Sequence, residues 1–231
     1  MIRTRASTNC VAVVPAKRSS VRLPGKNWRP FYGGMSLVEI KIRILRQCPP
    51  VSRIVVSTDD ESRRDAVAAL GADFVKRDPE QCTDHLTIRQ LVMQELEGFE
   101  DDLVYWAHPT SPFVAPSTVN RAIEMARQDL TRCVFGVERL YDYLWNENGP
   151  VNYDPEHEPR SQDLSPLWRV TGGIHIASGS LMKQKGAQTF LPHKFIELGR
   201  IEALDINNPE DWALCSNLAP SVMPSILELV R

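Results

Sequence analysis

Residues 11–27 have the sequence VAVVPAKRSSVRLPGKN, in which a short apolar run leads into a loop with four cations, two serines, one glycine and no acid. The apolar stretch from Cys10 to Val14 predicts a buried parallel strand, because strands that are covered on both faces are hydrophobic throughout. In an open α/β sheet, ligands bind just beyond the carboxyl ends of such strands. The four cations would concentrate positive charge there, and the loop amides can bind phosphate oxygens. The stretch therefore predicts a site for an anion such as a triphosphate.

The excess of positive charge is confined to this part of the chain. Residues 1–38 contain no Asp or Glu, whereas the whole chain carries 29 acidic and 27 basic side chains. A local excess fits a small anionic ligand better than a nucleic-acid partner, which usually requires a basic domain. A solvated basic loop without a ligand is the alternative that charge alone leaves open.

Strand-like and helical patterns alternate along the rest of the chain. Apolar residues recur at helical spacing in 36–47, and the acids of 58–61 suit the positive end of a helix that closes at Gly71. The same criteria predict strands at 53–57, 73–76, 103–107, 133–137 and 169–177, and helices at 85–97, at 117–128 with Ser117 as its cap, and from Pro209 onward. This alternation predicts a three-layer, doubly wound α/β fold with a mostly parallel, Rossmann-like sheet.

Length and composition fit one domain. With 231 residues and 42% hydrophobic composition the chain can bury a substantial core, so we expect a single domain over residues 1–231. No apolar run approaches the roughly 20 residues that span a bilayer, and no signal-peptide core follows residues 1–9. A cytoplasmic protein without a membrane partner is expected. The five cysteines are scattered without a CxxC pair, which predicts reduced thiols.

Residues 139–167 interrupt the alternation. The segment is rich in Tyr, Trp, Asn and Pro and has little helical period. Aromatic side chains are costly to leave in water, so the segment predicts an inserted arm that a second subunit covers in a homodimer. A lid over the active site is the competing interpretation.

Six segments in collinear order, covering nearly the whole chain, resemble the acylneuraminate cytidylyltransferase family, the CMP-sialic acid synthetases and their relatives. They are the basic loop with its RLPGK turn (22–26), VSTDDE (56–61), RDPEQCTD (77–84), HPTSPF (108–113), SQDLSPLWRVTGGIHI (161–176) and LDINNPEDW (204–212). The resemblance implies a nucleotidyltransferase-type fold, a homodimer built through the arm, Mg²⁺ as cofactor, CTP as donor and pyrophosphate as product.

The resemblance also assigns a nucleotide site. It comprises Ala16, Lys17, Ser19, Ser20, Arg22, Lys26, Asn27, Arg77 and Asp84. Lys17, Arg22 and Lys26 would bind the triphosphate and, with Asp205, are the predicted catalytic residues. Arg77 and Asp84 belong to the segment that distinguishes cytosine from larger bases.

The acceptor and the metal are assigned to later segments. The acceptor residues implied are His108, Thr110, Ser111, Arg160, Gln162, Thr171 and Gly172. Asp205 and Asn207 would hold Mg²⁺, because residues two apart on a strand face the same side. Three positions expected to face the acceptor depart from the family's pattern: His108 stands for a Gln, Thr171 for an Asn and Asn207 for an Asp. In the nucleotide loop, Lys17 stands where the family usually has an Arg.

These departures leave the acceptor open. A sugar hydroxyl benefits from a general base, whereas a phosphonate oxygen is already anionic near neutral pH. Sialic and other nonulosonic acids, Kdo-type sugars and small phosphonates are all candidates, and loss of the second carboxylate favours an acceptor that arrives charged. Two further alternatives are a sugar-1-phosphate nucleotidyltransferase that uses another base and a catalytically silent nucleotide-binding homologue.

Overall fold

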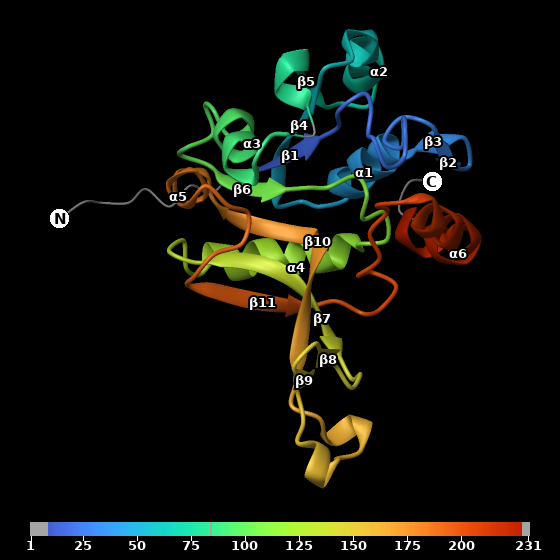
Figure 1. Ribbon diagram of the computed structural model, residues 1–231. Coiled ribbons are helices and arrows are strands. Elements are labelled where there is room, and N and C mark those ends of the chain that lie inside the picture. The colour runs from blue at the N-terminus through green and yellow to red at the C-terminus, as the bar shows by residue number, and fades with distance from the viewer. Residues whose placement is uncertain (1–8, 84, 228–231) are drawn as a thin grey trace, which may run out of the picture.

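The computed structural model describes residues 9–83 and 85–227, which form one seven-stranded sheet with helices on both faces (Figure 1). The strand order is β11-β7-β10-β6-β1-β4-β5. The strands are β1 (Cys10–Pro15), β4 (Val51–Thr58), β5 (Asp73–Lys76), β6 (Leu103–Trp106), β7 (Cys133–Leu140), β10 (Leu167–Ser178) and β11 (His193–Glu197). The pairs β1/β4, β1/β6, β4/β5 and β11/β7 are parallel, and β10 runs antiparallel to both of its neighbours.

The helices make three layers with the sheet. They are α1 (Leu37–Arg46), α2 (Arg64–Ala69), α3 (Ile88–Glu95), α4 (Pro116–Arg127), α5 (Gly179–Lys185) and α6 (Pro209–Leu227). Helices α1, α2 and α4 pack on one face of the sheet, and α3 and α5 pack on the other. Helix α6 covers the outer side of α1. The predicted three-layer, mostly parallel fold is confirmed.

Short elements connect these layers. They are the hairpin β2 (Pro30–Tyr32) with β3 (Met35–Ser36), and the 3-10 turns η1 (Glu61–Arg63) and η2 (Pro79–Cys82). Ser36 begins α1 with a capping box, in which its hydroxyl accepts from Glu39 N and the Glu39 carboxylate accepts from Ser36 N. Gly71 lies just after α2 with a φ of 74°, which is the left-handed conformation that favours glycine at a helix end.

Two elements of the main sheet and its helix layers, β11 and α5, escape the sequence patterns. The segment HKFIE forms β11, in which Ile196 is the one buried side chain, and α5 buries Gly179 and Met182 alone. Neither segment has enough apolar residues to show the alternation of a strand or the spacing of a helix. No helix of the described residues is long and apolar enough to cross a membrane, and the five cysteines are free thiols.

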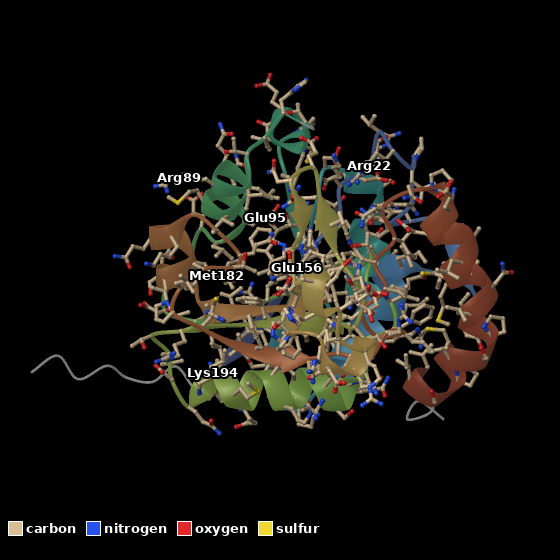
Figure 2. All side chains as sticks on the ribbon, turned by 60° about the horizontal axis from the view of Figure 1, so that its bottom comes forward. Arg22, Arg89, Glu95, Glu156, Met182 and Lys194 are labelled. Atoms are coloured by element: carbon tan, nitrogen blue, oxygen red, sulfur yellow. The ribbon has the colours of Figure 1, made fainter. Side chains whose placement is uncertain are left out.

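Strands β7 and β10 continue beyond the sheet as a two-stranded ribbon that carries an arm (Figure 1). The arm contains β8 (Trp145–Asn146), β9 (Gly149–Pro150), η3 (Pro155–His157) and η4 (Ser161–Asp163). The turned view of Figure 2 brings it forward, so that Glu156 lies in front of the body of the protein. Trp145 is 63% exposed and Tyr141 is 50% exposed, although Trp145 Nε1 donates to the Tyr153 hydroxyl at 2.7 Å.

The predicted cap of α4 is wrong. Ser117 is exposed, and the N-terminal residue of the helix is preceded by Ala115, which has no capping side chain of its own. A residue from far along the chain takes the role: Glu202 accepts from Ala115 N at 2.9 Å and from the Thr118 hydroxyl at 2.8 Å. The carboxylate also lies at the positive end of the helix dipole.

We therefore expect Glu202→Ala to lower the free energy of unfolding by about 1–2 kcal/mol, because two donors at the start of α4 lose their acceptor. Ser117→Ala is the matched control and should stay within about 0.5 kcal/mol of wild type. Urea unfolding measures both values. Equal effects of the two variants would show that Glu202 does not cap α4.

Candidate active site

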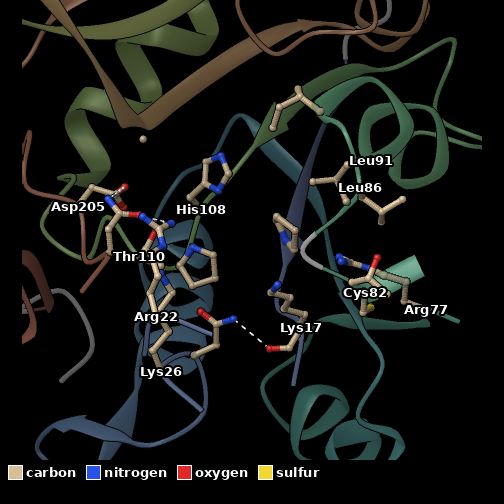
Figure 3. A pocket seen from close by; sticks show the side chains of 17 residues that line it. Lys17, Arg22, Lys26, Arg77, Cys82, Leu86, Leu91, His108, Thr110 and Asp205 are labelled. Atoms are coloured by element: carbon tan, nitrogen blue, oxygen red, sulfur yellow. Dashed lines mark hydrogen bonds between the residues drawn. The ribbon is translucent and has the colours of Figure 1, made fainter. Parts of the chain in front are cut away.

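A cavity of about 380 Å³ lies at the carboxyl ends of β1, β5 and β6 (Figure 3). The residues that line it are Pro15, Lys17, Arg22, Lys26, Asn27, Arg77, Cys82, Thr83, Leu86, Ile88, Leu91, His108, Pro109, Thr110, Gly172, Asp205 and Asn207. Ten predicted site residues are among them, from five separate segments of the chain. The parallel strands explain this convergence, because their carboxyl ends meet at one edge of the sheet.

The loop after β1 is fixed by hydrogen bonds from its own side chains. Lys26 is 9% exposed and its Nζ donates to the Ile206 carbonyl at 2.7 Å. Burial lowers the pKa of Lys26, and the Asp205 carboxylate opposes that shift. Asn27 Nδ2 donates to the Lys17 carbonyl at 3.2 Å, while Asn27 Oδ1 is buried without a partner among the described residues. The loop thus presents cations to the cavity and keeps one unused acceptor, Asn27 Oδ1, buried.

A chain of polar contacts crosses the cavity from this loop. Arg22 Nη2 donates to Asn207 Oδ1 at 3.4 Å, Asn207 Nδ2 donates to Asp205 Oδ2 at 2.8 Å, and the Ser111 hydroxyl donates to Asp205 Oδ1 at 3.3 Å. Asp211 holds the same segment at the start of α6, because its carboxylate accepts from the backbone N–H groups of Asn207 and Asn208. Asn207 is therefore a bridge between a cation and a carboxylate.

Asp205 is ionised at neutral pH. Burial on its own would raise the pKa of Asp205, but a hydrogen bond from Thr110, the neighbouring His108, the Asn207 amide and Lys26 together hold that pKa below its ordinary value. The Asp205 carboxylate can therefore accept hydrogen bonds and bind a cation, but because its pKa is low it is a weak base.

The pair Asp205 and Asn207 suits Mg²⁺ in part. Their nearest side-chain atoms lie 2.8 Å apart, and two adjacent oxygen ligands of an octahedral Mg²⁺ lie about 2.9 Å apart. The Asn207 amide must rotate to bring its oxygen to that place. No group of three or more His, Cys, Asp or Glu side chains within residues 9–83 and 85–227 forms a metal site. Such a pair fits an ion whose other ligands come from phosphate oxygens and water.

Arg77 depends on a residue that the sequence patterns miss. Arg77 and Glu95 of α3 form an ion pair in which both side chains are buried. Arg77 Nε also donates to the Ser57 hydroxyl, and Nη2 to the Ser57 carbonyl, each at 3.3 Å. Glu95 therefore fixes the direction of the guanidinium. The available signal was an acid among the apolar residues of an amphipathic helix.

Lys41 is the second residue that the patterns miss. It lies on the buried face of α1, is 0% exposed, and donates from Nζ to the Ser111 carbonyl at 2.8 Å. It thereby holds the 108–112 loop against α1. Burial lowers the pKa of Lys41 to about 8. A lysine within an apolar helical stripe is the sequence signal for such a position.

An uncharged polar wall borders the cavity at His108. His108 Nε2 lies 3.3 Å from Gln188 Oε1, and the His108 ring meets the His175 ring edge to face at 5.6 Å. Burial lowers the pKa of His108, and it lowers the pKa of His175 to about 3, so both rings are neutral at pH 7. Gln188 Nε2 and His175 Nδ1 are buried without hydrogen-bond partners in the described part of the chain.

Several predicted site residues do not line the cavity. Ala16 is buried beneath the loop, and its carbonyl accepts from Trp28 Nε1. Ser19 and Ser20 lie in the same loop outside the lining, and Ser111 lies just behind it, bonded to Asp205. Asp84 lies outside the described residues.

Three predicted acceptor residues lie away from the cavity. Thr171 is buried at a shift of register in β10, where its hydroxyl accepts from Gly173 N at 3.4 Å. Gly172, by contrast, lines the cavity, and a Cβ there would lie 3.0 Å from the Ser111 hydroxyl and 3.1 Å from the Asp205 carboxyl carbon. Arg160 and Gln162 lie on the arm, at and inside η4. Within one chain they do not join the site.

Known proteins provide a matching family and individual relatives of this chain. A family model described as cytidylyltransferase matches residues 11–153, more than half of the chain. The chain is 29% identical over 221 residues to a CMP-N,N'-diacetyllegionaminic acid synthase of Legionella pneumophila, covering 90% of this chain and 95% of that protein. It is 28% identical over 222 residues to an N-acylneuraminate cytidylyltransferase A of Danio rerio, covering 91% of this chain and 50% of that protein.

A solved structure shares the fold. The CMP:2-keto-3-deoxy-manno-octonic acid synthetase complexed with CTP superimposes with a TM-score of 0.68 at 18% identity, over 92% of this chain and 99% of that one.

The buried Lys41 predicts a change of stability with pH. Its pKa is about 8 in the folded protein and about 10.5 in the unfolded chain, so between these values the unfolded state binds more protons and stability rises with pH. Below pH 8 both states hold the proton and the cost of the buried charge is constant. We expect wild type to gain on the order of 3 kcal/mol relative to Lys41→Met between pH 8 and 10.5. Urea unfolding of both proteins over this range measures the difference, and a constant difference would contradict the assignment.

Proposed function

The chain belongs to the cytidylyltransferase family and is a CTP-dependent enzyme of that kind, and from this premise we propose that its acceptor is a sugar acid of the nonulosonic type. The observation that carries the proposal is one cavity that brings Lys17, Arg22 and Lys26 together with Asp205 and a neutral His108 (Figure 3). The three cations suit a triphosphate, and the one carboxylate beside neutral polar groups suits a sugar hydroxyl.

The donor half of the reaction is attack on the α-phosphorus of CTP with loss of pyrophosphate. The protein's contribution is to hold the triphosphate in line with the attacking oxygen and to stabilise the charge that develops on the leaving group. Lys26 is already desolvated, so its interaction with a phosphate oxygen is stronger than that of a surface lysine. Arg77, which Glu95 fixes in the wall of the cavity, would meet the base.

The acceptor half favours a neutral hydroxyl. Asp205 is ionised and lies in the cavity wall, so a phosphonate oxygen placed beside it would meet a like charge. A sugar hydroxyl can instead donate to that carboxylate. The neutral His108 and the Thr110 hydroxyl in the cavity wall offer uncharged polar groups to the other polar groups of a sugar, and Gln188 and His175 lie behind His108. The two curated relatives described above are named for nonulosonic acids.

The proposal includes Mg²⁺ as the cofactor. Asp205 and Asn207 would hold it together with phosphate oxygens, and the ion would neutralise charge on the phosphates. The acceptor hydroxyl, when bonded to Asp205, is oriented by the protein independently of the ion.

The function is tested by measuring pyrophosphate release with CTP and Mg²⁺ against a nonulosonic acid, a Kdo-type acid, a small phosphonate and a sugar 1-phosphate, and with ATP, GTP and UTP in place of CTP. We expect turnover with CTP and the nonulosonic acid. Turnover with another nucleotide and a sugar 1-phosphate, or CTP binding without turnover of any acceptor, would overturn the proposal.

Loss of either loop cation should impair turnover. Arg22→Ala should lower kcat/KM by ~30- to 1000-fold, since a charge-assisted contact in a poorly hydrated site contributes about 2–4 kcal/mol to transition-state stabilisation. Lys26→Ala should lower it at least as much and, because Lys26 also binds the Ile206 carbonyl, should reduce stability. Arg200→Ala is the matched control, since the Arg200 side chain is 89% exposed outside the cavity. A twofold effect of Arg22→Ala would contradict its role.

Asn207→Asp separates the two classes of acceptor. With a sugar hydroxyl as nucleophile, a carboxylate in place of the amide is a charged and stronger metal ligand, and kcat/KM should stay equal or rise. With a phosphonate, the new charge would repel the attacking oxygen, and kcat/KM should fall. Our proposal predicts the first result with a nonulosonic acid over a range of Mg²⁺ concentrations. A fall that persists at saturating Mg²⁺ would favour an acceptor that arrives charged.

We propose in addition that the arm forms a homodimer and that Arg160 and Gln162 meet the acceptor in the cavity of the other subunit. The exposed Trp145 and Tyr141 supply apolar area for such a contact, and the two polar residues belong to the arm, which projects away from the body of the subunit (Figure 1). A closed two-fold dimer would give each arm the same place on its partner.

Mixing two inactive variants tests the arm. Lys26→Ala and Arg160→Ala dimers, when exchanged at equal amounts, should recover about a quarter of wild-type activity, because half of the dimers are mixed and each mixed dimer has one intact site. A monomer in sedimentation, or no recovery after proven exchange, would exclude a shared site and favour a lid.

A further inference from the structure

A second cavity of about 380 Å³ lies on the other side of the loop that follows β1. The residues that line it are Arg18, Gly25, Trp28, Arg29, Asp60, Ser62 and Arg63. None of them lines the cavity proposed for CTP. We call it the rear cavity.

The rear cavity has more positive than negative charge. Three arginines line it with a single carboxylate, Asp60. That carboxylate is engaged, because it accepts from the Ser62 hydroxyl at 2.6 Å and pairs with Arg63 at 3.2 Å. Within the described residues, no carboxylate forms an ion pair with the side chain of Arg18 or Arg29. The nearby Asp59 accepts from the backbone N–H of Arg18 at 2.6 Å.

Two of the arginines are held in place by indole rings. The Arg29 guanidinium lies over the Trp212 ring, with Cζ 3.6 Å from the ring centroid, and the Arg63 guanidinium lies 5.2 Å from the Trp28 centroid. Arg29 Nε is buried and has no acceptor among the described residues. Arg63 Nε pairs with Asp60, so the terminal Nη groups of Arg29 and Arg63 are the donors left for a ligand. A guanidinium already stacked on a ring loses little further entropy when these groups bind.

We infer that the rear cavity is a second anion site that binds a phosphate-bearing small molecule. Guanidinium groups bind phosphate oxygens through paired N–H bonds, which is the chemistry that Arg18, Arg29 and Arg63 offer together. A cavity of this volume holds inorganic phosphate or pyrophosphate, and is large enough for a nucleoside monophosphate. These three probes share the same recognition chemistry, and a titration with each identifies the source.

The site shares one loop with the proposed CTP cavity. Arg18 follows Lys17, and Trp28 follows Asn27, so neighbouring residues line opposite cavities. Backbone bonds from Trp28 N and Arg29 N to the Gly25 carbonyl, at 3.0 and 3.1 Å, close the loop between them. The two sites are therefore separable by mutation although they share a wall.

Calorimetric titration with pyrophosphate tests the inference. Wild type should bind two equivalents, Arg22→Ala should weaken one of them, and Arg18→Gln and Arg63→Gln should each weaken the other by about tenfold or more. Arg18 is exposed, so its variant should fold like wild type, which thermal unfolding checks. Arg200→Gln is the control for the loss of one exposed positive charge. Parallel titrations use phosphate and CMP.

A single equivalent bound by wild type, or two equivalents with unchanged affinities in Arg18→Gln and Arg63→Gln, would overturn the rear site. Failure of the proposed function has a different signature, in which Arg22→Ala binds both equivalents like wild type.

Discussion

The peptide group of Ile206 joins the loops that build the proposed active site. Its carbonyl accepts from Lys26, 180 residues earlier in the chain, and its N–H donates to the Thr110 carbonyl at 2.9 Å. Lys41 then fixes the next peptide of the same loop through the Ser111 carbonyl. Burying two ammonium groups costs free energy. Their backbone acceptors offset that cost only while the three loops hold these positions. The cations of the first loop and the carboxylate of the last thus keep a fixed separation.

The general architecture and the position of the site follow from local patterns. Apolar runs such as 10–14, followed by a loop of cations, define a strand and its carboxyl end, and that end is where α/β sheets bind ligands. The residues that support the site could not be found in the same way. Glu95 and Lys41 act through contacts with segments far from them in sequence, and a helical pattern alone shows them as polar interruptions of an apolar face.

Other differences between the expected and the observed roles of residues have the same origin. Glu202 replaces Ser117 at the start of α4 because the fold brings a distant carboxylate to that place. Thr171 falls at a register shift in β10, so its side chain turns into the protein and not into the cavity. Arg160 is displaced from its expected position by the length of the arm, which no local pattern measures. In each case the chemistry of the residue was evident and its direction was decided by tertiary structure.

Strand β10 is shared by the sheet, the cavity and the arm. It pairs with β6 near its end, carries Gly172 beside Asp205, and begins at Leu167 opposite Leu140 of β7. A deletion of one residue within the ribbon would turn every following side chain to the opposite face. The elements of the arm beyond Leu140 do not pair with the main sheet. A change of length in the turns of the arm would therefore leave the register of the ribbon and the place of Gly172 intact, and would move only what the arm carries, Arg160 and Gln162 included.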